Sequence, residues 1–102
     1  MIRTYSRALG ALALGIMASS AAPAFALEGG GLSSEATLSL EQARAAALKT
    51  QPGTILDQEL EHRKGGSGLR YSFDIKVGAV THEVGIDAKT GEALQNTAEG
   101  QK

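Results

Sequence analysis

The stretch LRYSFDIKVGAVTHEVGI, residues 69–86, decides the fold of this chain. Over residues 69–77 apolar side chains alternate strictly with polar or charged ones, which is the period of a half-buried β-strand. The alternation resumes over residues 80–86, after the link Gly78-Ala79, where glycine occupies the position that a type II′ turn requires. The sequence therefore predicts a β-hairpin with one apolar face.

The two-residue turn also fixes which residues face each other across the hairpin. It places Val77 opposite Val80, and the other pairs follow by counting back along both strands. The apolar face is predicted to pair Ile75 with His82, Phe73 with Val84 and Tyr71 with Ile86. The polar face is predicted to pair Arg70 with Asp87, Ser72 with Gly85 and Asp74 with Glu83.

One helix is predicted upstream of the hairpin, beginning at Leu40. Ser39 and Gln42 have the spacing of a capping box, in which each side chain bonds to the backbone of the other. The run LEQARAAALK, residues 40–49, consists almost wholly of strong helix formers, and its small apolar stripe allows close approach to a sheet. Gln51-Pro52-Gly53 then ends the helix.

Two weaker strands complete the predicted sheet. Ile55–Lys64 has only Leu56 and Leu60 clearly inward, and the glycine-rich segment Lys64–Gly68 reads as a mobile loop before the hairpin. If Lys64 faces Leu69, Leu60 lies beside Phe73 and Glu59 beside Asp74. Glu92–Gln95 is a candidate fourth strand. The predicted fold is α+β, with one N-terminal helix packed on a small antiparallel sheet of three strands, or four with this segment.

A secretory signal peptide is predicted over residues 1–26, where Arg3 and Arg7 precede a short apolar run. We expect cleavage between Ala26 and Leu27. The run is too short and too rich in alanine and glycine to favour a membrane span of about 20 residues, so no stable membrane anchor is expected after cleavage. The chain has no cysteine, which excludes a disulfide, a lipid-modified cysteine and thiolate chemistry.

The mature chain is expected to be a single small domain in the periplasm or the medium. Cleavage leaves eight basic against eleven acidic residues, a formal charge of −3, which argues against nucleic acid as a partner. We predict a flexible linker over residues 27–37, the domain over residues 38–95 and a disordered tail over residues 96–102. So small a domain is expected to be marginally stable, and a weak homodimer would stabilise it by burying more surface.

The segment after the hairpin has the residues of a structural turn. Asp87 can accept hydrogen bonds from the backbone amides that follow it, and Gly91 supplies the positive φ of a tight connection. We therefore assign Asp87 and Gly91 to the turn that ends the sheet.

In these features the chain resembles the PepSY family, small secreted modules also found in the propeptides of thermolysin-like metalloproteases. The resemblance rests on the order and spacing of five segments: LEQARAAA at 40–47, PG at 52–53, LE at 60–61, YSFDI at 71–75 and VGIDAKTG at 84–91. It implies the α+β fold described above and a role in inhibiting or regulating peptidases, with no catalytic residues to transfer. The chain departs from the family pattern at Ser72, where glutamate is frequent, and at Gly85, where a larger residue is common.

No pattern in the sequence predicts an enzyme or a bound cofactor. His62 and His82 fall on different strands, too far apart to share one metal ion, and no serine lies in a nucleophile elbow. An acidic row of Glu59, Asp74 and Glu83 is the weak candidate for a cation site. The leading hypothesis is a noncatalytic module that binds a peptidase or another envelope protein through a sheet edge or the loop Lys64–Gly68. The alternative is a cation-binding or sensory accessory protein that uses the acidic face.

Overall fold

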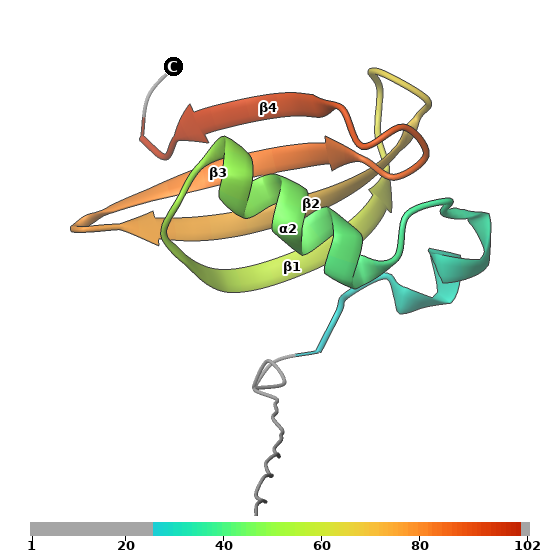
Figure 1. The fold of residues 1–102 in the computed structure, drawn as a ribbon, viewed down its shortest axis with the longest axis horizontal. Coiled ribbons are helices and arrows are strands. Elements are labelled where there is room, and N and C mark those ends of the chain that lie inside the picture. Colours follow the sequence, from blue (N-terminus) through green and yellow to red (C-terminus); the bar gives the residue numbers. More distant parts are fainter. Residues whose placement is uncertain (1–25, 101–102) are drawn as a thin grey trace, which may run out of the picture.

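The computed structural model describes residues 26–100, which form one helix on one face of a four-stranded sheet (Figure 1). The strands are antiparallel and follow one another in the order β1-β2-β3-β4. The α+β prediction is therefore confirmed, with the fourth strand present. The elements are a 3-10 helix η3 (Gly30–Glu35), α2 (Leu40–Thr50), β1 (Thr54–His62), β2 (Leu69–Val77), β3 (Val80–Asp87) and β4 (Ala93–Ala98).

Helix α2 begins and ends where the sequence predicts. Gln42 N donates to Ser39 Oγ at 3.1 Å, and Ser39 N donates to Gln42 Oε1 at 2.9 Å, which completes the capping box. Ala43 and Ala47 are fully buried against the sheet. Because these side chains are small, the helix axis can lie close to the strands. The helix covers one face of the sheet (Figure 1).

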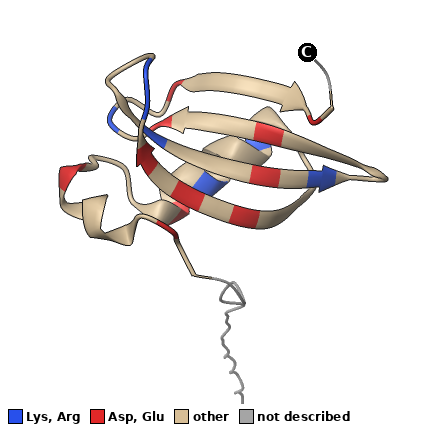
Figure 2. Cartoon of the chain, turned by 180° about the vertical axis from the view of Figure 1, so that it is seen from behind, with Lys and Arg blue, Asp and Glu red and all other residues tan. Residues whose placement is uncertain are grey.

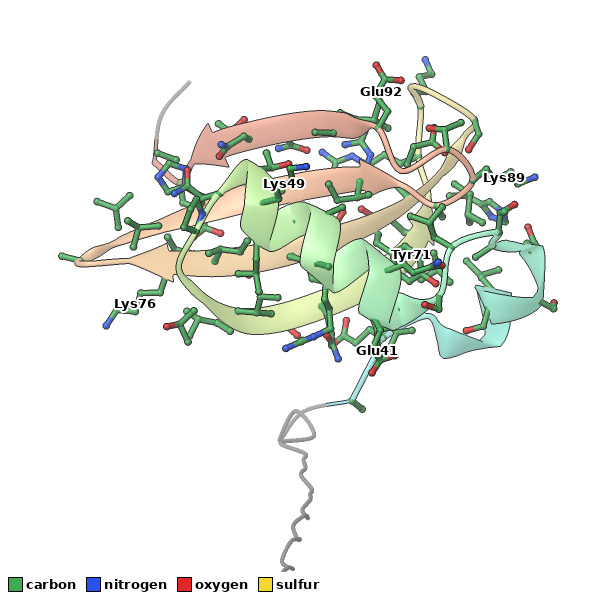
Figure 3. The ribbon with its side chains drawn as sticks, in the orientation of Figure 1. Glu41, Lys49, Tyr71, Lys76, Lys89 and Glu92 are labelled. Atoms are coloured by element: carbon green, nitrogen blue, oxygen red, sulfur yellow. The ribbon has the colours of Figure 1, made fainter. Side chains whose placement is uncertain are left out.

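The core lies between α2 and the sheet. Tyr71 and Phe73 stack with ring centroids 6.3 Å apart, and the Tyr71 hydroxyl donates to Leu38 O at 2.9 Å. Figure 3 shows Tyr71 close to the segment that leads into α2. The buried apolar residues are Ala43, Ala47, Ile55, Leu60, Leu69, Tyr71, Phe73, Ile75, Val84, Ile86 and Ala88.

The β2–β3 hairpin has the predicted register throughout. Val77 pairs with Val80 across the turn, and Phe73 pairs with Val84. Gly78 has a φ of 64°, a conformation that glycine adopts without strain. On the polar face Asp74 pairs with Glu83.

The register predicted for β1 is wrong by two residues. His62, and not Lys64, pairs with Leu69, so that Leu60 faces Tyr71. The connecting loop is longer than expected, with Arg63 N donating to Gly68 O at 2.9 Å. A bulge between Ile55 and Asp57 shifts the register again. It buries Ile55 and leaves Leu56, which was expected inside, 46% exposed.

The segments at the two ends of the domain differ from the sequence expectation. β4 continues to Ala98, so residues 96–98, expected in a disordered tail, pair with β3. Residues 27–37, expected as a flexible linker, contain η3, and Glu28 forms an isolated parallel bridge with Glu59. The low hydrophobicity of both segments concealed this backbone pairing. The predicted signal peptide lies outside the described residues except for Ala26, so the cleavage site stays a prediction.

Candidate functional site

The face of the sheet opposite α2 carries most of the strand carboxylates (Figure 2). Acidic positions on β1, β2 and β3 lie side by side across this open face. The register places Asp57, and not Glu59 as predicted, opposite Asp74, with Glu83 on the far side of Asp74. A shallow hollow of about 50 Å³ lies among these residues, lined by Asp57, Gln58, Glu59, Ser72, Asp74 and Glu83. We call Asp57, Glu59, Asp74 and Glu83 the acidic cluster.

Two carboxylates of the acidic cluster, Asp74 and Glu59, have raised pKa values. The pKa of Asp74 is raised by burial and then by the nearby carboxylates of Glu99, Asp57 and Glu83. The pKa of Glu59 is raised by burial and then by Glu61, Glu28, Asp57 and Glu83. Arg63 offsets part of this charge, since its Nη1 lies 3.0 Å from Glu83 Oε2 and 3.3 Å from Glu61 Oε2.

The acidic cluster does not form a metal cage. Within residues 26–100, no three histidine or carboxylate side chains converge in a way that could hold a metal ion. The two histidines also lie apart from the cluster: His62 Nε2 is 2.9 Å from Glu35 Oε1, and His82 Nδ1 is 2.9 Å from Asn96 Oδ1. Both imidazoles therefore serve local contacts at the margins of the sheet.

Asp87 connects the turn after β3 with the loop before β2. It is fully buried and accepts from Lys89 N at 2.8 Å and Thr90 N at 3.2 Å, as expected of a turn aspartate. It also accepts from Ser67 N at 2.6 Å and Ser67 Oγ at 2.7 Å. Burial raises its pKa, but these hydrogen bonds outweigh burial and lower the pKa to about 2. Gly91, with a φ of 83°, donates its N–H to Asp87 O at 2.9 Å.

The loop Lys64–Gly68, expected to be mobile, is therefore attached to the sheet. Besides the two bonds from Ser67, Arg70 Nη2 donates to Lys64 O at 3.1 Å. A Cβ at Gly66 would overlap Asp87 Oδ2, so only glycine fits there. The Ser67 hydroxyl donates to the buried Asp87, whose pKa of about 2 makes it a weak general base. The sequence showed the turn at Asp87 but not its partner Ser67.

Arg70 lies flat across the open face of β3. Its cross-strand partner is Asp87, as predicted, but its guanidinium passes over Gly85 and its Nη1 donates to Gln95 Oε1 on β4 at 2.9 Å. A Cβ at residue 85 would lie 2.9 Å from Arg70 Cδ. The departure of Gly85 from the family pattern was the signal for this contact. The hydrogen bond from Arg70 to Gln95 connects β2 with β4 over the open face.

The two edges of the sheet differ in what covers them. At the β1 edge, Glu28 N donates to Gln58 O at 3.2 Å and Leu60 N donates to Glu28 O at 2.8 Å. Gly29 follows with a φ of 79°, and a Cβ there would overlap Leu60 O. The segment that contains Glu28 and Gly29 therefore occupies the middle of this edge, and we call residues 27–35 the N-terminal strap.

The β4 edge has no such cover. β4 is the last strand in the sheet order, and no backbone hydrogen bond from any other segment within residues 26–100 reaches its outer side. The strand contains neither a charged residue nor a proline, the usual means of blocking an edge. Its outward N–H and C=O groups are therefore left without a backbone partner among the described residues.

These features define a small α+β module in which one helix covers an antiparallel meander and leaves one face and one edge free. Residues 37–95 match the sequence model of the PepSY family, which is described as peptidase propeptide and YPEB domain. The match covers more than half of the chain, and the chain therefore belongs to the PepSY family. Comparison with curated proteins and with solved structures finds no match.

Proposed function

We propose that this protein is a noncatalytic exported module that binds a peptidase, or another protein of the cell envelope, and inhibits or regulates it. The family supports this proposal, because its domains are generally noncatalytic modules associated with peptidase propeptides. The observation that carries it is the open β4 edge, which can accept an extended segment of a partner as an added strand.

Export is the second part of the proposal. It rests on the predicted signal peptide, residues 1–26, with cleavage between Ala26 and Leu27. Within residues 26–100, no helix is both long enough and apolar enough to cross a bilayer. The proposed location is the periplasm or the medium. Amino-terminal sequencing of the exported protein tests the cleavage site: Leu27 as the first residue supports it, and retention of residue 1 contradicts it.

Of the surfaces suggested by the sequence, the structure favours the β4 edge over the loop Lys64–Gly68. The loop is held by Asp87 and Arg70, which already bond the Ser67 amide and hydroxyl and the Lys64 carbonyl. The β1 edge is occupied by the N-terminal strap. At β4 the backbone groups on the outer side have no protein partner among the described segments, and a strand bound there would cost no existing hydrogen bond.

Capture from the periplasm with a matched pair of variants tests the proposed function. Tagged protein with Asn96→Pro loses an edge N–H, whereas Asn96→Ala loses only the side-chain contacts of Asn96 to Gln51 and His82. The wild type and Asn96→Ala should retain a peptidase and slow its hydrolysis of a peptide substrate, and Asn96→Pro should not. Equal inhibition by all three proteins, or none by any, contradicts the proposal.

The cation-binding alternative is favoured by one observation, the raised pKa of Asp74 and Glu59 in the acidic cluster. A divalent cation would relieve the repulsion among these carboxylates, although they do not converge on one point. Calorimetric titration with Ca²⁺ distinguishes the two functions. Heat of binding that disappears in Asp74→Asn supports the alternative, and the absence of heat together with an unchanged melting temperature removes it.

A further inference from the structure

The hydrogen-bonding pattern of β4 determines which of its residues could pair with an added strand. Glu99 N donates to Thr81 O at 2.8 Å, which fixes the alternation along β4. Thr97 and Gln95 direct their N–H and C=O groups toward β3, and Asn96 and Ala98 direct theirs outward. Both residues at the outward positions are uncharged, and Asn96 is exposed. This part of the edge is therefore free to form a ladder.

Carboxylates stand at both ends of this uncharged edge. Glu92 precedes β4 and is exposed, and Figure 3 shows it projecting from the start of the strand. Glu99 follows β4, is also exposed, and is close enough to Asp74 to raise its pKa. Asp74 in turn pairs with Glu83. Within residues 26–100, no lysine or arginine forms an ion pair with Glu92, Asp74 or Glu99.

A second copy of the chain does not satisfy this arrangement. An antiparallel pairing of β4 with itself along its whole length brings Glu92 of each copy to the Glu99 end of the other. The like charges would meet twice, once at each end of the new ladder, and like charges across neighbouring strands are destabilising. The edge therefore favours a different polypeptide, one that carries positive charge where this chain carries Glu92 and Glu99.

We propose that the β4 edge binds an extended polypeptide segment with an uncharged centre and a lysine or arginine at each end. The centre would form backbone hydrogen bonds with Asn96 and Ala98, and the basic ends would lie near Glu92 and Glu99. This inference rests on the proposed function, because the segment belongs to the peptidase or envelope protein that the module regulates. It adds the chemistry by which that partner is recognised.

Titration of the exported protein with two short peptides, acetyl-KTVTVTVK-amide and acetyl-ETVTVTVE-amide, tests the inference by amide NMR. The lysine-ended peptide should shift the amides of Asn96 and Ala98 and bind about fivefold more tightly at low salt than the glutamate-ended one. High salt should reduce the difference. Glu92→Gln combined with Glu99→Gln should abolish the preference while leaving the fold unchanged, because neither side chain forms an ion pair and glutamine can keep the hydrogen bond of residue 99 with Asp74.

Three results would overturn the inference: equal binding of the two peptides, amide shifts centred on another part of the sheet, or a concentration-dependent dimer through β4. Absence of binding by either peptide would overturn it as well. The outcome is separable from the proposed function. Peptide binding at β4 without inhibition of any captured peptidase would remove the proposed function alone, and inhibition that survives Glu92→Gln with Glu99→Gln would remove the charge requirement alone.

Discussion

The two edges of the sheet differ in whether their backbone hydrogen-bonding groups are covered by another segment of the chain. At β1 the N-terminal strap pairs with the strand through Glu28, and a bulge between Ile55 and Asp57 distorts the remainder. At β4 an uncharged strand lies open along its outer side. Exposed edges invite association, and proteins usually block them. A fold that covers one edge with its own chain and leaves the other free thereby restricts strand addition to one side.

The contrast extends to the side chains around each edge. Carboxylates crowd the open face near β1, where Glu28 adds to the charge around Glu59. β4 carries no charge along its length and has Glu92 and Glu99 only at its ends. Charge is therefore concentrated around the covered edge, whereas at the open edge it stands only at the two ends of the strand.

We expect the largest loss of stability when Asp87, which holds the turn between β3 and β4, is replaced. Asp87→Ala removes the acceptor for four hydrogen bonds, from Ser67 N, Ser67 Oγ, Lys89 N and Thr90 N. We expect the free energy of unfolding to fall by about 3 kcal/mol, because buried donors are left without partners. Urea denaturation measures this. Asp87→Asn keeps the size and one acceptor and should cost less; equal stability of Asp87→Ala and wild type would contradict the assignment.

The same carboxylate predicts how stability depends on pH. Its pKa in the folded protein is about 2, below the ordinary value of 3.8, so the folded state binds the proton less readily than the unfolded state. The stabilisation is complete above about pH 5 and is lost as pH falls through 3.8 and then below 2, a change of about 2 kcal/mol. Urea denaturation across this range should show the loss in the wild type and a smaller slope in Asp87→Asn. Parallel pH profiles would contradict the shift.

Detaching the strap should make the two edges alike. A Cβ at Gly29 would overlap Leu60 O in a backbone conformation that favours glycine, whereas a Cβ at Gly30 meets nothing within 4 Å. Gly29→Ala should lower the free energy of unfolding by about 2 kcal/mol and Gly30→Ala by much less. Amide exchange of Leu60 should accelerate only in Gly29→Ala. If both variants behave alike, the strap does not hold the β1 edge.

The smallest effect concerns the repulsion beside β4. Asp74→Asn should raise the free energy of unfolding at pH 7 by about 0.5 kcal/mol, because Asp74 lies among Glu99, Asp57 and Glu83. The gain should vanish at low pH, because Asp74, whose pKa is raised, is then protonated in the wild type as well. Glu83→Gln is the comparison, since Glu83 is paired with Arg63 and its loss should bring no gain. Thermal unfolding at two pH values measures both.

Local patterns in the sequence predict the hairpin and the helix but not the contacts between distant segments. Strict alternation and the turn at Gly78 determine the β2–β3 register, and Ser39 with Gln42 determines the start of α2. The β1 register depends on the length of the loop at residues 63–68 and on a bulge, neither of which follows a local rule, and the pairing of Glu28 with β1 is made by a segment of low hydrophobicity. Neither leaves a periodic signal, because both depend on the packed sheet.

The same distinction applies to the candidate site: local patterns predict one part of it, and contacts between distant segments determine the rest. The polar face could be predicted because it follows from the hairpin register, which placed Asp74 opposite Glu83. The position of Asp57 opposite Asp74 could not, because it depends on the length of the loop between β1 and β2, which sets His62 opposite Leu69. The full length of β4 could not be predicted, because Ala93–Ala98 combines small and polar residues whose pairing with β3 is a tertiary effect.

Amide hydrogen exchange of the exported protein, alone and with acetyl-KTVTVTVK-amide, tests the central claim most directly. The Leu60 amide, which donates to Glu28 O, should be protected in both samples. The outward amides of Asn96 and Ala98 should exchange rapidly in the free protein and become protected when the peptide is bound. Protection of Asn96 in the free protein, or protection by the peptide at β1 in place of β4, would contradict the account.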